Sequence, residues 1–135
     1  MKLLSYYLSD WILSHLFNVA PFSPPLVMGV ALSRYNPGPS GYYIDEPPLA
    51  YNYSRVATYA SWWTHDGVSS IYNSTAIVFD EASADWGEIT HFALFDSANY
   101  GAGNMLFYGE LPTPAVVSSG CIARFKFATL SVFLD

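Results

Sequence analysis

The sequence predicts an all-β protein: an antiparallel β-sandwich of about seven strands, preceded by one N-terminal amphipathic α-helix. Apolar residues near the start recur at helical spacing, whereas the second half is a series of short apolar runs separated by turn residues. At 135 residues, one domain spanning 1–135 is expected. It divides into a helical arm, 1–20, and a sandwich, 26–135.

The helix is expected over residues 3–17 and must stop by Ala20, because Pro21 disfavours a helical residue before it. A helix of this length is marginal in water when it is isolated. The arm is therefore the candidate attachment element, with Leu4, Leu8 and Trp11 expected to contact a partner. The full apolar face is formed by Leu4, Leu8, Trp11, Ile12 and Leu16.

The remaining elements are short apolar segments of strand length bounded by Gly, Pro, Asn and Asp. The segment 36–52 interrupts them, and its proline and glycine content predicts a loop of limited flexibility that carries Tyr42 and Tyr43. An Asp66-Gly67 turn signal follows the second strand. The expected strands span 26–33, 54–59, 75–79, 83–87, 89–96, 104–109 and 122–134.

The last of these segments changes face along its length. Phe125 and Phe127 share one side, whereas Leu130, Val132 and Leu134 fall on positions of the opposite parity. Either a bulge or bend lies near 128–129, or the strand is buried on both faces beyond that point. In both cases we expect this strand to be central in its sheet.

The composition indicates a surface that is partly covered by partners. Hydrophobic residues make up 52% of the chain, aromatic residues 18% and charged residues 12%, against roughly 25% charged in an ordinary soluble domain. Interfaces are depleted in charge and enriched in aromatic residues, so we expect a homo-oligomer; the alternative is a monomer with a large aromatic core. The net charge of −6 argues against nucleic-acid binding, and no segment reaches the roughly 20 apolar residues of a membrane span.

The sequence predicts no catalytic residue, no metal site and no cofactor. The three histidines lack metal-ligand spacing, the acidic residues lack an EF-hand pattern, and the single cysteine gives neither a disulfide framework nor a zinc motif. A Ser-His-Asp triad or a pair of catalytic carboxylates is defined by spatial geometry, so both remain alternatives at this point.

A second alternative is glycan binding, because exposed aromatic rings can stack on sugars. Tyr42, Tyr43, Trp62 and Trp63 are the candidate residues. The competing interpretation, which the low charge of the chain favours, is that these rings form core or subunit contacts.

The chain resembles a family of small bacteriophage tail or tail-fibre proteins. The resemblance runs over most of the chain and is most specific in 73–79, 84–96 and 103–109. It implies a virion structural protein without catalytic residues. The positions that look fold-defining in this resemblance are Tyr53, Arg55, Trp86, Gly87, His91, Phe92 and Asp96.

This resemblance implies a non-enzymatic subunit of the tail, as a fibre, adaptor or tip protein, that is made in the host cytoplasm and assembles with other virion proteins. A cement protein on the capsid surface is the alternative. For Arg55 we expect a partly buried ion pair with Asp96 or Asp85. The chain departs from the family pattern in its Pro- and Tyr-rich segment 35–52 and in Phe127.

Overall fold

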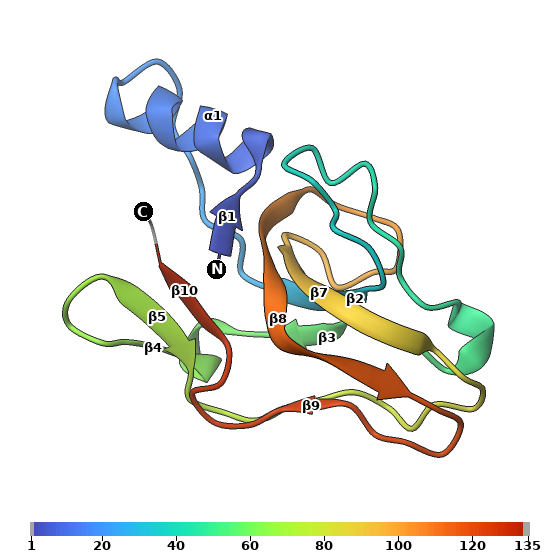
Figure 1. Ribbon diagram of the computed structural model, residues 1–135. Coiled ribbons are helices and arrows are strands. Elements are labelled where there is room, and N and C mark those ends of the chain that lie inside the picture. The colour runs from blue at the N-terminus through green and yellow to red at the C-terminus, as the bar shows by residue number, and fades with distance from the viewer. Residues whose placement is uncertain (1, 134–135) are drawn as a thin grey trace.

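A computed structural model describes residues 2–133 and confirms a fold of antiparallel sheets with one helix near the N-terminus (Figure 1). Three sheets are present among these residues: five strands in the order β1-β8-β7-β2-β3, three in the order β10-β5-β4, and the pair β6-β9. The elements are β1 Lys2–Leu4, α1 Tyr6–Leu16, β2 Met28–Ser33, η1 Leu49–Tyr51, β3 Val56–Thr58, η2 Ala60–Trp62, β4 Trp63–His65, β5 Ser70–Asn73, β6 Ile77–Val78, β7 Gly87–Phe95, β8 Met105–Val117, β9 Arg124–Phe125 and β10 Ser131–Phe133.

Strand β2 lies inside the five-stranded sheet and is buried on both faces, which explains its uninterrupted apolar sequence. Val30 and Leu32 face the main core, where they meet side chains of the smaller sheets such as Ile77 and Val132. Ala31 faces the other way, into a second cluster against which Ile44 of the 36–52 segment packs. The large sheet is thus covered on one face by the other strands and on the opposite face by a loop.

The main core is strongly aromatic. Trp86 and Tyr53 are essentially inaccessible to solvent, and their rings meet edge to face with centroids 5.3 Å apart. Phe79 stacks on Tyr53 at 6.2 Å, and Phe92 and Phe125 extend the cluster. Edge-to-face pairs of this kind are worth about 0.5–1.5 kcal/mol beyond their buried area, so this cluster ties the sheets together.

The N-terminal helix is shorter than predicted. Residues Lys2–Leu4 form the edge strand β1, which pairs with β8, and the helix begins only after Ser5. Ser5 is the N-cap: its hydroxyl accepts a hydrogen bond from the backbone N–H of Leu8 at 3.0 Å. Leu4 therefore lies opposite Phe107 in a sheet and does not continue the apolar face of the helix.

The prediction that residues 122–134 form one central strand is wrong. The chain breaks near 128–129 as predicted, where Ala128 adopts a left-handed conformation with φ of 61°. The break separates two short strands, β9 and β10, which belong to different sheets and lie at their edges. Phe127 is 62% exposed at this turn, and Leu134 lies outside the described residues.

Other strand boundaries also differ. Residues 83–86 form no strand: the Ser83 N–H donates to the carbonyl of Tyr51, and the Trp86 N–H donates to the carbonyl of Val117 just before the β7–β8 pairing begins. The turn at Asp66-Gly67 connects two strands, β4 and β5, that were not expected. The Asp66 carboxylate closes this hairpin by accepting backbone N–H groups of Val68, Ser69 and Ser70.

Strand β8 is much longer than the expected 104–109, and only part of it is flanked on both sides. Its first residues pair with both β1 and β7, whereas among residues 2–133 the stretch 110–117 has only β7 beside it. An irregularity opposite Ile89–His91 pushes four residues of β8 out of register. Two of these residues are prolines, Pro112 and Pro114.

Candidate functional site

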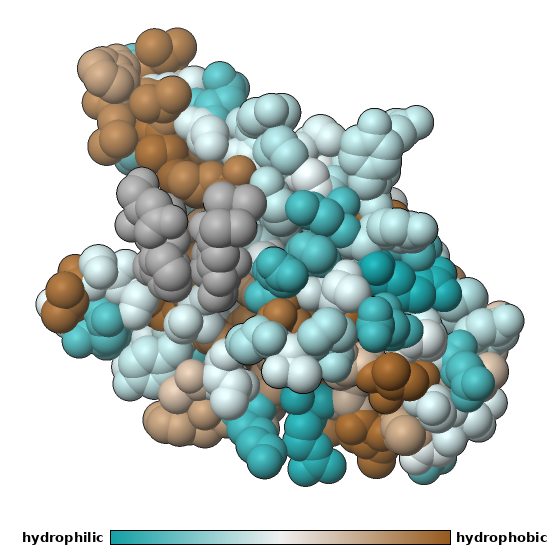
Figure 2. All heavy atoms as spheres, viewed as in Figure 1, coloured by the Kyte–Doolittle hydropathy of each residue, from teal (hydrophilic) through white to brown (hydrophobic). Residues whose placement is uncertain are grey.

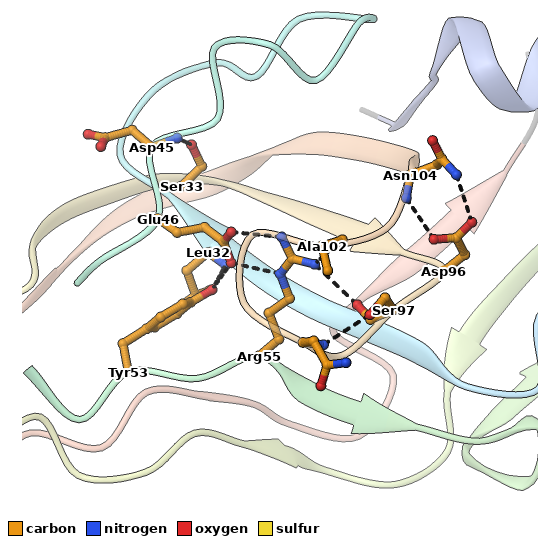
Figure 3. Close-up of polar contacts among 11 residues, drawn as sticks. Leu32, Ser33, Asp45, Glu46, Tyr53, Arg55, Asp96, Ser97, Ala102 and Asn104 are labelled. Carbon is orange, nitrogen blue, oxygen red and sulfur yellow. Dashed lines mark hydrogen bonds and ion pairs between the residues drawn. The ribbon is translucent and has the colours of Figure 1, made fainter. Parts of the chain in front are cut away.

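A buried arginine organises the loops at one end of the molecule. Arg55, which immediately precedes β3, is 5% exposed, and its guanidinium forms a bidentate ion pair with Glu46 through contacts of 2.9 and 2.8 Å. Its remaining nitrogen donates to the carbonyl oxygens of Ala102 at 2.7 Å and Ser97 at 3.2 Å (Figure 3). The guanidinium also lies 3.8 Å from the centre of the Phe95 ring.

Tyr53 completes this network. Its hydroxyl donates to Glu46 Oε1 at 2.7 Å and accepts from the backbone N–H of Leu32 at 3.1 Å. Burial, together with the neighbouring Glu46 carboxylate, raises the pKa of Tyr53 well above its usual range, because both disfavour a phenolate. Tyr53 therefore remains a neutral donor, and the loop containing Glu46 is fixed to β2 and β3.

The carboxylate partner of Arg55 is not the one expected from the sequence. Asp96 instead accepts from the backbone and side-chain amides of Asn104, at 2.6 and 3.2 Å, and closes the β7–β8 hairpin. Asp85 accepts from the backbone N–H of Ser119 at 2.8 Å. Asp96 closes a hairpin and Asp85 holds the turn that follows β8. Glu46 instead comes from the segment 36–52, whose path cannot be read from periodicity.

The segment 36–52 is ordered by its own contacts. Arg34 and Asp45 form a bidentate pair at 2.9 Å, and the Ser33 hydroxyl accepts from the backbone N–H of Asp45 at 3.0 Å. At its tip, Tyr42 and Tyr43 meet edge to face and are 81% and 67% exposed. The fold thus presents two adjacent tyrosines to solvent on a rigid support.

The two candidate tryptophans lie elsewhere and are half-buried. Trp62 and Trp63 pack against the main core from η2 and β4, below the 36–52 loop in the view of Figure 1. The indole N–H of Trp63 donates to the Thr58 hydroxyl at 3.0 Å. The four candidate aromatic residues therefore do not form one surface.

Besides Tyr53 and Phe92, which belong to the main core, three further positions that looked fold-defining support the core or the large sheet. Trp86 is fully buried, and its indole N–H donates to the carbonyl of Tyr51 at 2.9 Å. Gly87 starts β7 with φ of +86°, a conformation that side chains with a Cβ rarely adopt. His91 is half-buried in β7, and desolvation lowers its pKa, with Glu110 on β8 opposing this shift.

The arm separates into a packed base and an exposed tip. Leu8 is 5% exposed, and the Trp11 ring is half-buried between Tyr7 and Phe22, with centroids about 6 Å apart. The residues expected to meet a partner are thus largely covered by the protein itself. The exposed apolar residues, which we call the arm tip, are Leu13, Leu16, Phe17 and Val19, at 57%, 70%, 76% and 79% exposure.

Of the arm tip, only Leu16 was expected on the apolar face, although the sequence carries a signal for the other residues. Leu13, Leu16 and Phe17 follow the i, i+3, i+4 spacing of a helical face. In Figure 2 brown hydrophobic spheres gather at the upper left of the molecule, where α1 lies, with fewer teal ones among them. This face differs from the one that carries Leu8 and Trp11.

The described residues contain no group of three or more His, Cys, Asp or Glu side chains that could hold a metal ion. Each histidine ring nitrogen Nδ1 is occupied locally: by the N–H of Phe22 for His15, by the N–H of Gly67 for His65, and by the Thr90 hydroxyl for His91. Within residues 2–133, no helix is long and apolar enough to cross a membrane.

Comparison with known proteins identifies one family. A search of curated proteins finds no match. The family model described as podophage GP4 fiber I protein gp80 matches residues 3–133, which include the arm, the loop network around Arg55 and all three sheets. The chain therefore belongs to the gp80 family of podophage fibre I proteins, a family of phage tail-fibre structural proteins.

Proposed function

We propose that this protein is a non-enzymatic structural subunit of a bacteriophage tail, acting as a fibre, adaptor or tip protein that binds other virion proteins and copies of itself. The family match over residues 3–133 carries this proposal. The polar chemistry of the chain is consistent with it. The most deeply buried charged group, Arg55, and the carboxylates of Glu46, Asp85 and Asp96 are all engaged in holding loops.

Cryo-electron microscopy of the intact particle tests this placement, together with mass spectrometry of purified virions. We expect a fixed number of copies per particle and density for the sandwich at the tail. Density spread over the head lattice would instead make the chain a capsid cement protein. Absence from purified particles would reject a structural role altogether.

A receptor-binding role is a second candidate, favoured by the exposed tyrosine pair. Tyr42 and Tyr43 project from a loop that the Arg34–Asp45 pair already holds in place, and rigid tyrosines make effective contacts at low entropic cost. Isolated protein should then bind host cells or their surface polysaccharide, and Tyr42→Ala/Tyr43→Ala should abolish this binding. Tyr6→Ala, which removes a tyrosine of comparable exposure from the arm, is the control.

A further inference from the structure

We propose that the arm tip of one chain inserts into an apolar cleft between the sheets of a second copy, so that subunits associate arm to cleft. The proposal rests on the structural role proposed above and names the partner of the arm. Two features of the same chain lead to it: an exposed apolar projection and, between the described strands, an open apolar recess.

The projection is the arm tip, which the rest of residues 2–133 leaves exposed. The base of α1 is fixed by backbone hydrogen bonds from Ser5 to Leu106 and from Tyr6 to Pro39, each 2.9 Å long. The helix then points away from the sheets (Figure 1). Four large apolar side chains, each more than half exposed, gather at its far end, and side chains of this kind are stabilised by burial in a partner.

The recess lies between the five-stranded and three-stranded sheets and has a volume of about 370 Å³. Both sheets contribute to its walls, and Ile71, which is 43% exposed, stands at its mouth. The volume is within the range of about 300–1,000 Å³ that is typical of binding pockets. Its principal lining residues are Met28, Trp63, His65, Ile71, Phe107 and Val132.

The charge distribution is compatible with a second copy as the occupant, which carries the apolar projection that the recess lacks. Each chain carries a net charge of −6, so two copies repel each other wherever their acidic surfaces meet. The sequence from Trp11 to Ser33 contains no Asp, Glu, Lys or Arg, and the lining of the cleft contains none either among the residues that the structure describes. The arm tip and the cleft therefore match in polarity and bring no carboxylates of the two copies together at the contact.

An arm-to-cleft contact joins two different surfaces and is therefore heterologous. Such contacts close into a ring when the rotation between subunits permits and otherwise extend into a filament. Each subunit offers one arm and one cleft, so the contact can be repeated from copy to copy. This architecture would let a single small domain build an elongated or ring-shaped assembly.

Light scattering coupled to size-exclusion chromatography tests the contact on the full chain over a range of concentrations. We expect the wild-type chain to be oligomeric and the arm variant Leu16→Ser/Phe17→Ser to be monomeric, with a roughly hundredfold weaker self-association. The matched control Val116→Ser/Phe127→Ser removes exposed apolar side chains of 68% and 62% exposure elsewhere and should remain oligomeric. A monomeric wild type, or an oligomeric arm variant, would overturn the proposal.

Mixing two defective chains identifies the cleft as the receptor. Ile71→Glu places a carboxylate at the mouth of the cleft and should also be monomeric, but it keeps an intact arm. Mixed with the arm variant, it should form a heterodimer, since one intact arm meets one intact cleft. Failure of the mixture to associate would overturn the proposal, provided that both variants show the far-UV circular dichroism of the wild type.

Cross-linking provides a measurement that does not depend on loss of association. In a Cys121→Ser background, Phe17→Cys/Ile71→Cys should form intermolecular disulfides, whereas either cysteine alone should form few. Equal cross-linking by the Phe17→Cys single variant would contradict the pairing. A chain that is found in virions but is monomeric in solution defeats this inference alone, whereas an oligomer that is absent from virions defeats the proposed function alone.

Discussion

The loop network around Arg55 and the arm tip differ in whether their side chains find partners within the chain. In the loop network, Arg55 pairs with Glu46, and these two side chains are only 1% and 5% exposed. Arg34 pairs with Asp45 beside them. The arm tip carries no charge and leaves large apolar side chains in water. The first region is complete within one chain, whereas the second, under the proposal above, would be completed by another molecule. Substitutions in the loop network should therefore change stability, and substitutions in the arm tip should change assembly.

The largest effect is expected for Arg55→Ala. This substitution leaves the Glu46 carboxylate buried without its cation and removes the donor to Ala102 and Ser97, which should cost about 3–5 kcal/mol of unfolding free energy. Urea unfolding followed by tryptophan fluorescence measures the loss. The double variant Arg55→Met/Glu46→Gln removes both charges and keeps an acceptor for Tyr53, so it should be clearly less destabilised. An equal loss in the two variants would mean that the ion pair is not the cause.

A smaller effect is expected for Gly103→Ala in the β7–β8 hairpin that Arg55 holds. Gly103 has φ of +78°, and an added Cβ would lie 2.5 Å from an Asp96 carboxylate oxygen and 2.6 Å from Ser97 Cβ. Backbone strain and this clash together should cost about 2–4 kcal/mol. Gly101→Ala is the matched control, because its φ is +72° but its Cβ would meet open space. It should lose only the strain, about 1–2 kcal/mol, and equal losses by thermal denaturation would exclude the clash.

The base of the arm should respond more weakly. Ser5→Ala removes the cap that accepts the N–H of Leu8 and should cost the helix about 1 kcal/mol. Hydrogen exchange should show faster exchange of the α1 amides, with little change in the sheets. Ser5→Thr keeps a hydroxyl that can cap the helix without burying a charge and should keep the amides protected. Uniformly faster exchange through β7 and β8 would show that the arm and the sheets unfold together.

The arm tip should have the smallest effect on the stability of a single chain. Leu16→Ser/Phe17→Ser replaces side chains that are 70% and 76% exposed, so the unfolding free energy of dilute monomer should change by less than about 0.5–1 kcal/mol. Thermal melts at low concentration measure this. A large loss of unfolding free energy would show that these residues pack within their own chain. The arm tip would then contribute to stability as the Arg55 network does.

The parts of the fold that depend on local pattern could be predicted from the sequence. The helix follows from the spacing of Leu8, Trp11 and Ile12, and the break near Ala128 follows from the change of parity along the last segment. The strand formed by Lys2–Leu4 could not be predicted, because it exists only through pairing with β8, which lies about a hundred residues away. Judged by spacing, Leu4 fits the apolar face of the helix as well as it fits a strand.

The candidate site was predictable only in part, for the same physical reason. Arg55 and Tyr53 were selected through the family resemblance, but their common partner, Glu46, lies in a proline-rich loop without periodicity. The two aromatic pairs illustrate the limit of composition. Tyr42 and Tyr43 are exposed, whereas Trp62 and Trp63 pack against the core. The proline and glycine content places the tyrosines in a loop, but composition does not show which of the two pairs is buried.

The prolines of β8 have a consequence for how the protein avoids aggregation. A strand edge with free amide donors is a template for sheet-to-sheet stacking, and the stretch 110–117 has no second neighbour among residues 2–133. Pro112 and Pro114 remove two donors from this stretch, and in β9 and just beyond it the exposed Arg124 and Lys126 place charge on another short edge. Amyloid-like growth along these edges is thereby discouraged. A chain so rich in aromatic residues can then associate through defined contacts without uncontrolled pairing of its strand edges.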